Sequence, residues 1–151
     1  MWYDQIRDDF SHFLASLGAP TLQEPLAIVV RGAAWTLVGR IDGITGEGRI
    51  QVRPAKCNSK DLIRAWITHL ALTAAHGPVQ TSVVGTDTRW VFGEVAEPLT
   101  VLDRLIDGYN ASLREPIPFF TKASHAYAAQ TLKLERQAAT GRGTASALPI
   151  D

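Results

Sequence analysis

The chain has 151 residues, a length typical of one domain with a buried core. Hydrophobic residues make up 46% of it and charged residues 20%, and the net charge is zero because 15 basic and 15 acidic residues cancel. This balance excludes a uniformly basic surface, so any nucleic-acid-binding surface must be local. No apolar run approaches the ~20 residues that span a bilayer. With a single cysteine, Cys57, no internal disulfide forms, and no secretory signal is recognisable, so we expect a cytoplasmic protein.

A helix is predicted at the start of the chain, ending at Gly18 and Pro20, because apolar residues recur at helical spacing. Three strands follow, at Pro25 to Arg31, Ala34 to Asp42 and Arg49 to Arg53, and glycine-rich turns separate the last two. The residues of the apolar face of the first helix are Trp2, Ile6, Phe10, Phe13, Leu14 and Leu17.

The clearest helix begins at Asn58 or Ser59, either of which can cap it, and ends at the segment His76 to Pro78. The segment "TSVVGTDTRWVF" predicts a hairpin that turns at Gly85 to Thr88. Pro98 begins another helix, an extended proline-containing link follows it, and a last helix is expected from about Lys122 to Ala138.

This order of elements predicts an α/β (α+β) fold: a mixed sheet with helices packed on it. We expect one domain over residues 1–139 and a flexible tail over residues 140–151, where periodicity is lost and Gly, Ala and Ser dominate. Three tryptophans, Trp35, Trp66 and Trp90, are expected in the core.

The strand-turn-strand from Leu37 to Lys56 has nearly the layout of a metal-dependent nuclease site. Such a site needs carboxylates on adjacent strands to hold Mg²⁺, and a lysine near the attacking water. Asp42 fits the first acid, but Gln51 stands at the second acidic position and Arg53 at the lysine position. Gln51 is neutral, and Arg53 does not give up a proton. We therefore interpret these three positions as a degenerate nuclease site with no catalytic residue and no metal.

Basic residues crowd the second of these strands and the helix after it. Arg49 and Arg53 share a strand face, and Lys60 and Arg64 lie four apart on a helix. Such a strip suits contacts with DNA phosphates, which add salt-sensitive affinity without reading bases. The predicted DNA-binding residues are Arg49, Arg53, Lys56, Lys60 and Arg64; a solvated polar face is the alternative.

Other residues give no chemistry. The histidines His12, His69, His76 and His125 have no ligand-like spacing, and we expect His69 to be a partly buried polar residue. No phosphate-binding loop of the "GxxxxGKT" kind occurs. We expect no cofactor and no small-molecule ligand.

Four motifs occur in order along most of the chain, from about Trp2 to Tyr127. They are "GRID" at Gly39 to Asp42, "RPAK" at Arg53 to Lys56, "WITHL" at Trp66 to Leu70, and "PIPFF" at Pro116 to Phe120 after Tyr109. In this order they resemble the carboxy-terminal domain of RecC, the gamma subunit of exodeoxyribonuclease V (the RecBCD helicase-nuclease).

The resemblance implies a restriction-endonuclease-like fold without nuclease activity. It also implies DNA and the helicase-nuclease (RecB-like) and helicase (RecD-like) subunits as partners, in double-strand-break repair and recombination. RecC is very large and its domain continues past the position of Tyr127, so we interpret the chain as a fragment or truncated form.

Two alternatives stay open. One is a small Mg²⁺-dependent nuclease that uses Asp42 with an acid from elsewhere, Glu47 or Glu94. The other is a protein-interaction module that docks through its helices and never touches DNA.

Overall fold

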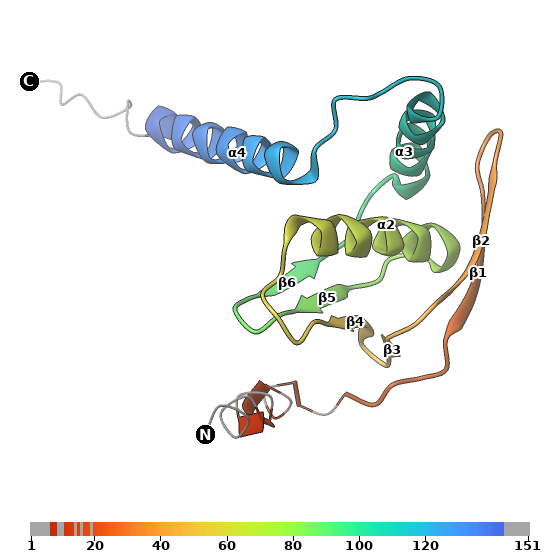
Figure 1. Cartoon of the computed structure of the whole chain (residues 1–151), viewed down its shortest axis with the longest axis vertical. Helices are drawn as coiled ribbons and strands as arrows, with labels where there is room; N and C mark the ends of the chain where they lie inside the picture. The colour runs from red at the N-terminus through yellow and green to blue at the C-terminus, as the bar shows by residue number, and fades with distance from the viewer. Residues whose placement is uncertain (1–6, 9–10, 14, 16, 19, 144–151) are drawn as a thin grey trace, which may run out of the picture. The chain divides into compact units, whose positions relative to one another are not determined.

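The chain forms two compact units, residues 1–117 and residues 118–151. The computed structural model describes residues 7–8, 11–13, 15, 17–18 and 20–143, with side chains as far as residue 136 (Figure 1). In the first of the predicted helices, the described residues 7–8, 11–13 and 15 are helical, and Phe13 is buried. Leu17 lies in the turn that follows and is half-buried, and the other expected apolar residues, Trp2, Ile6, Phe10 and Leu14, lie outside the described residues.

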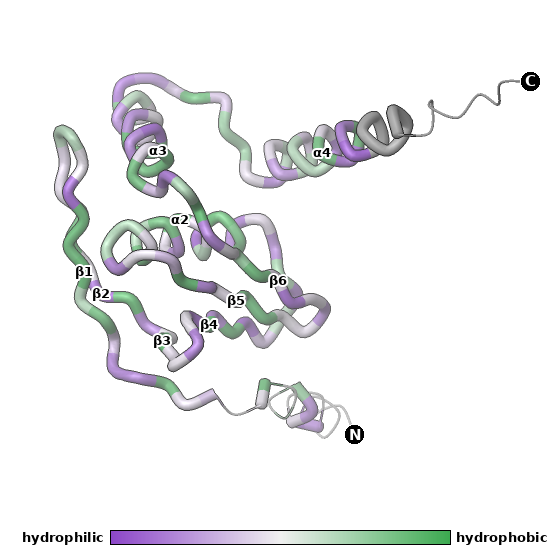
Figure 2. Tube along the Cα trace, turned by 180° about the vertical axis from the view of Figure 1, so that it is seen from behind, coloured by the Kyte–Doolittle hydropathy of each residue, from purple (hydrophilic) through white to green (hydrophobic). Residues whose placement is uncertain are grey.

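An antiparallel ribbon follows, made of β1 (Leu26–Arg31) and β2 (Thr36–Ile41). Alternation places Ile28, Val30 and Ile41 on the buried face, where they join the hydrophobic core. Figure 2 shows β1 as a hydrophobic run. The ribbon is a sheet of its own, which the sequence did not predict.

The second sheet has four strands in the order β3-β4-β5-β6. Their bounds are β3 Ile44–Thr45, β4 Gly48–Val52, β5 Thr81–Val84 and β6 Arg89–Phe92. β4 and β5 are parallel, whereas the two outer pairings are antiparallel. The predicted mixed sheet and α+β class are confirmed; the short strand β3 was not predicted.

Two glycines turn the chain sharply, Gly43 between the ribbon and this sheet and Gly48 at the start of β4. Gly43 has φ 73° and Gly48 has φ 136°, a region that other residues rarely adopt. A Cβ on Gly43 would collide with the backbone oxygen of Ile50, whose N–H donates to the Gly43 carbonyl at 2.8 Å. Glycine at 43 therefore lets the end of β2 approach β4 closely.

The parallel pair is joined by α2 (Ser59–His76), which lies along the sheet (Figure 1). Asn58 caps it as predicted, accepting from the N–H groups of Lys60 and Asp61, while the Asp61 carboxylate accepts from the Asn58 N–H. The buried side of α2 carries Leu70 and Leu72, which pack against the ribbon and the next helix.

The next helix, α3 (Pro98–Ser112), begins at the predicted proline and packs on α2 through the buried Leu102. The indole N–H of Trp35, in the turn of the ribbon, donates to the Asp103 carboxylate at 2.7 Å. Trp35 and Trp66 contact the core, as expected. Trp90 is 43% exposed, so its expected place in the core is wrong.

The second unit consists of an extended segment and α4 (Thr121–Gly143), a few residues longer than predicted. Hydrophobic and hydrophilic turns alternate along α4 in Figure 2, and Tyr127, Leu132 and Leu134 are exposed. The domain boundary after residue 139 stays a prediction. Within the described part of the chain, no helix combines the length and apolar character needed to cross a membrane.

Candidate functional site

Two of the three degenerate nuclease positions meet where the end of β2 approaches β4. Arg49 joins them: its Nε donates to the backbone oxygen of Asp42 at 3.1 Å, and its Nη2 donates to Oε1 of Gln51 at 3.2 Å. The same Nη2 lies 3.7 Å from Oδ1 of Asp42. One guanidinium nitrogen thus contacts the side chains at both positions where the sequence analysis expected the acids of a nuclease.

Arg49 is buried, with 6% of its side chain exposed, whereas the side chain of Asp42 is 87% exposed. Alternation along β4 places Arg49 and Gln51 on the same face as their β5 partners Thr81 and Val83. This is the face on which His69 of α2 contacts Thr81. Burial lowers the pKa of the Arg49 guanidinium, and the nearby Asp42 charge opposes that shift. Its Nη1 is buried without a hydrogen-bond partner.

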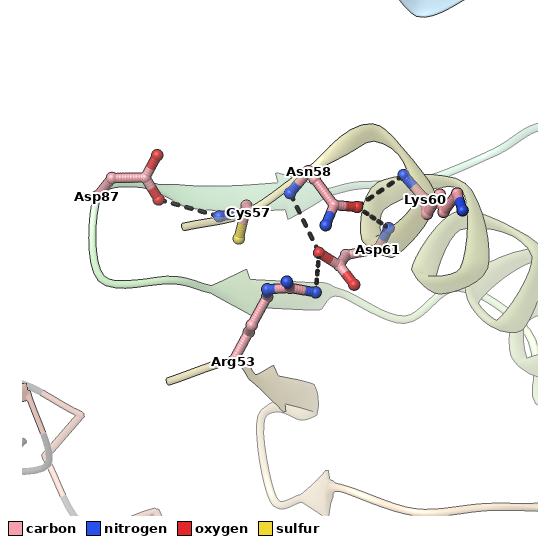
Figure 3. A network of polar contacts seen from close by, with 6 residues as sticks. All are labelled: Arg53, Cys57, Asn58, Lys60, Asp61 and Asp87. Carbon is pink, nitrogen blue, oxygen red and sulfur yellow. Dashed lines mark hydrogen bonds and ion pairs between the residues drawn. The ribbon is translucent and has the colours of Figure 1, made fainter. Parts of the chain in front are cut away.

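The third position, Arg53, is engaged elsewhere. Figure 3 shows its guanidinium directed at the Asp61 carboxylate in the first turn of α2, with which it forms an ion pair. The Arg53 side chain is 34% exposed and that of Asp61 16%, so this pair is largely shielded from water. Arg53 therefore fixes the end of β4 to the start of α2.

These contacts change the expected basic strip. Arg49 is buried and Arg53 is paired, so neither guanidinium is freely presented to a phosphate. The other three, Lys56, Lys60 and Arg64, are exposed. We name Lys56, Lys60 and Arg64 the exposed basic group. The backbone N–H groups of Lys60 and Asp61 donate to the Asn58 side chain. The N-terminus of α2 therefore offers few unbonded donors to an anion.

The acids considered for a migrated ligand lie in exposed positions. Glu47 is in the turn between β3 and β4, and Glu94 follows β6. Among the residues that the structure describes, no three His, Cys, Asp or Glu side chains are grouped so as to hold a metal ion. The donor set beside Asp42, an amide and a guanidinium, does not fit Mg²⁺, which prefers carboxylate oxygens.

Cys57 is held in the segment between β4 and α2. Its N–H donates to Oδ1 of Asp87 at 3.1 Å (Figure 3). Burial, followed by the charges of Asp87 and Asp61, raises the pKa of the Cys57 thiol, while Arg53 opposes this. A thiol held protonated is a poor nucleophile or metal ligand, which agrees with a structural role.

His69 is fully buried on α2, more deeply than predicted. Its Nε2 lies 2.9 Å from the Gly93 carbonyl oxygen and its Nδ1 lies 3.0 Å from Oγ1 of Thr81. A carbonyl only accepts, so Nε2 carries the proton and Nδ1 accepts from the hydroxyl. Burial lowers the pKa of His69, and the Gly93 bond opposes it. His69 therefore connects α2 to β5 and to the segment that follows β6.

A cleft of about 470 Å³ lies on the face of the four-stranded sheet that points away from α2. Arg89 and Ser82 line it, and a guanidinium nitrogen of Arg89 donates to the Ser82 hydroxyl at 3.2 Å. Sequence reasoning missed these two residues, because the hairpin that brings them together carries no recognisable motif.

The chain matches the model of the RecC C-terminal domain over residues 1–132. It is also similar to the RecBCD enzyme subunit RecC of Mycolicibacterium smegmatis (strain ATCC 700084 / mc(2)155), with 30% identity over 105 residues. This match covers 64% of the chain and 10% of the relative, so the chain spans about a tenth of that protein's length.

Proposed function

The chain belongs to the RecC C-terminal domain family, and from this premise we propose that it is a non-cleaving, nuclease-like domain of a RecC-like subunit. In this proposal the domain binds the DNA backbone and partner subunits of a RecBCD-type complex during double-strand-break repair and recombination. The complex would act in the cytoplasm, and its ATP-dependent helicase and nuclease activities would reside in other subunits.

The observation that carries the proposal is the state of the three nuclease positions. Asp42 faces a guanidinium, Gln51 supplies an amide oxygen to that guanidinium, and Arg53 is paired with an acid on α2. A Mg²⁺ nuclease needs carboxylates at the first two positions and a proton-transferring lysine at the third. Cleavage by this centre is therefore not expected.

A restriction-endonuclease-like origin is supported by topology as well. β4 leads through α2 into the parallel strand β5, and β2 ends beside β4. In such nucleases the acidic positions are likewise at the end of one strand and inside the next. Loss of the chemistry with retention of the scaffold explains why Asp42 and Gln51 still lie together.

Backbone binding of DNA rests on the exposed basic group. Lys60 and Arg64 are four residues apart on α2 and therefore share a face, and Lys56 precedes the helix. Exposed ammonium and guanidinium groups bind phosphates without reading bases, so we expect affinity that falls with salt and depends little on sequence.

The test is to replace Lys56, Lys60 and Arg64 by Gln in one variant and to titrate duplex DNA over a salt series. Each lost phosphate contact should reduce the slope of log K against log salt by about 0.9. A matched variant replaces Arg31 and Arg40, which are exposed on the outer face of the ribbon, and should leave the slope unchanged. Equal effects of the two variants would refute the assigned surface.

Docking to partner subunits is the second candidate function. Leu105 and Tyr109 on α3 and Leu113 at its C-cap lie four residues apart and are 40%, 62% and 68% exposed. A row of large apolar side chains at this spacing is typical of a helix face that another protein covers. Replacement of Tyr109 and Leu113 by Ser should abolish co-purification with a RecB-like or RecD-like subunit while DNA binding persists.

A further inference from the structure

The centre beside Asp42 contains a cation of its own. Nη2 of Arg49 is the atom that contacts both Oε1 of Gln51, at 3.2 Å, and Oδ1 of Asp42, at 3.7 Å. In a metal-dependent nuclease, the ligands at these two positions would instead share a divalent ion. The guanidinium thus lies between the two side chains that would hold the metal.

The position of Arg49 is fixed by the fold. Its backbone is in the middle of the β3-β4-β5 part of the sheet, with its N–H donating to the Gln80 carbonyl at 2.9 Å. Its Nε donates to the Asp42 carbonyl, and only 6% of its side chain is exposed. A buried arginine with two acceptors has no solvated position to which it could withdraw at low cost.

We propose that the guanidinium of Arg49 permanently replaces the divalent cation of the ancestral centre and excludes metal from it, even when an acid is restored at position 51. This rests on the proposed nuclease-like origin of the domain. One positive charge against the single Asp42 carboxylate balances the centre, as a divalent ion balances two carboxylates. A metal ion placed beside the guanidinium would be repelled because both are cations at contact distance from the same two side chains.

The proposal makes Arg49, rather than the missing acid, the decisive change. Experiments can then distinguish two explanations for why the centre would not bind a metal ion. If the missing carboxylate at Gln51 were sufficient, Gln51→Glu alone would recover metal binding. If Arg49 replaces the ion, Gln51→Glu would form a salt bridge with Arg49 and stay metal-free, and recovery would need Arg49→Ala as well.

The experiment measures thermal unfolding and Mn²⁺ titration of the full chain, with Mn²⁺ or Mg²⁺ alone as the probe. Four proteins are compared: wild type, Gln51→Glu, the double variant Arg49→Ala/Gln51→Glu, and Gln80→Glu as the matched control at a nearby exposed position. We expect no metal-dependent rise in Tm for wild type, Gln51→Glu or Gln80→Glu. The double variant should bind Mn²⁺ about tenfold or more tightly than Gln51→Glu, because a like charge has been removed, and its Tm should rise with metal.

Metal binding by wild type or by Gln51→Glu at the strength of the double variant would overturn the proposal, and so would a folded double variant that ignores Mn²⁺. If the double variant does not fold, the Tm of Gln51→Glu without metal, compared with the Tm of wild type, tests the proposal. A salt bridge to Arg49 predicts a higher Tm than wild type, whereas a half-buried carboxylate without that partner predicts a lower one. The metal titration contains no DNA. The metal-exclusion proposal can therefore fail while the DNA-binding proposal holds, and the DNA-binding proposal can fail while metal exclusion holds.

Discussion

Arg49 donates to the backbone oxygen of Asp42 at 3.1 Å and reaches its carboxylate at 3.7 Å, so a buried cation on β4 holds the end of β2. The two residues are expected to contribute unequally to the free energy of unfolding. The Asp42 carboxylate is mostly in water and its contact is long, whereas the guanidinium also serves Gln51 and is buried.

We therefore predict that Arg49→Ala lowers the free energy of unfolding by about 2–4 kcal/mol, because it leaves a cavity and acceptors without donors. Asp42→Asn should change it by less than about 1 kcal/mol, as expected for a solvated ion pair. Urea unfolding followed by circular dichroism measures both. A larger loss for Asp42→Asn than for Arg49→Ala would contradict the assigned roles.

Asp61 joins β4 to α2 through two contacts of one carboxylate. It accepts from the Asn58 N–H at 3.1 Å and pairs with Arg53. Asp61→Ala should cost about 1–3 kcal/mol of unfolding free energy, because a cap and a charged hydrogen bond are lost together. The control is Asp87→Ala, which removes an exposed carboxylate that accepts the Cys57 N–H. It should cost less, and equal losses would argue against the double role of Asp61.

His69 should make stability depend on pH. Its pKa is lowered in the folded state, so the unfolded chain takes up the proton first as pH falls. The stability is fully present above the unfolded value of about 6.5 and falls as pH drops below it, by up to ~1.4 kcal/mol per unit. The decline continues until the folded-state pKa is reached.

Replacing His69 by Gln should flatten this dependence at pH values below the ordinary histidine pKa of about 6.5. It should also lower stability at neutral pH, since Thr81 and the Gly93 carbonyl lose a well-placed partner. The matched control is His76→Gln at the exposed end of α2. An unchanged pH slope in His69→Gln would show that another group causes it.

The indole of Trp35 fastens the ribbon to α3 through Asp103. Asp103→Ala should lower the free energy of unfolding by about 1–3 kcal/mol, since a charged acceptor is removed from a half-buried donor. Asp103→Asn retains an oxygen acceptor and should keep most of the stability. Similar losses in both variants would mean that packing around residue 103, and not the hydrogen bond, determines the effect.

Local sequence signals predicted most of the elements. Asn58 and Asp61 form the expected cap, Pro98 begins α3, and the segment around Gly85 turns the β5-β6 hairpin. Each of these depends on residues close together in the chain, where capping and turn preferences act directly. The same signals could not show that the β1-β2 ribbon separates from the larger sheet, because that depends on how α2 and α3 pack on it.

The site was predicted less completely than the fold. The spacing of Asp42 and Gln51 identifies both positions. The same spacing argument assigns Arg49 to a phosphate-binding strip, because Arg49 and Arg53 share a strand face. Which face of β4 is covered depends on how α2 packs on the sheet, and this is set by tertiary contacts and not by the local sequence of β4. The polar pair Arg49 and Gln51 on one face was the available signal, since buried polar side chains are usually paired with one another.

In the proposed function this domain binds DNA and does not cut it. The most direct measurement is binding to a forked DNA over a salt series, with and without Mg²⁺, with cleavage products assayed in the same samples. We expect binding that weakens with salt, does not depend on Mg²⁺ and gives no products. Mg²⁺-dependent products that disappear in Asp42→Asn would contradict it and would mean that the centre is a working nuclease.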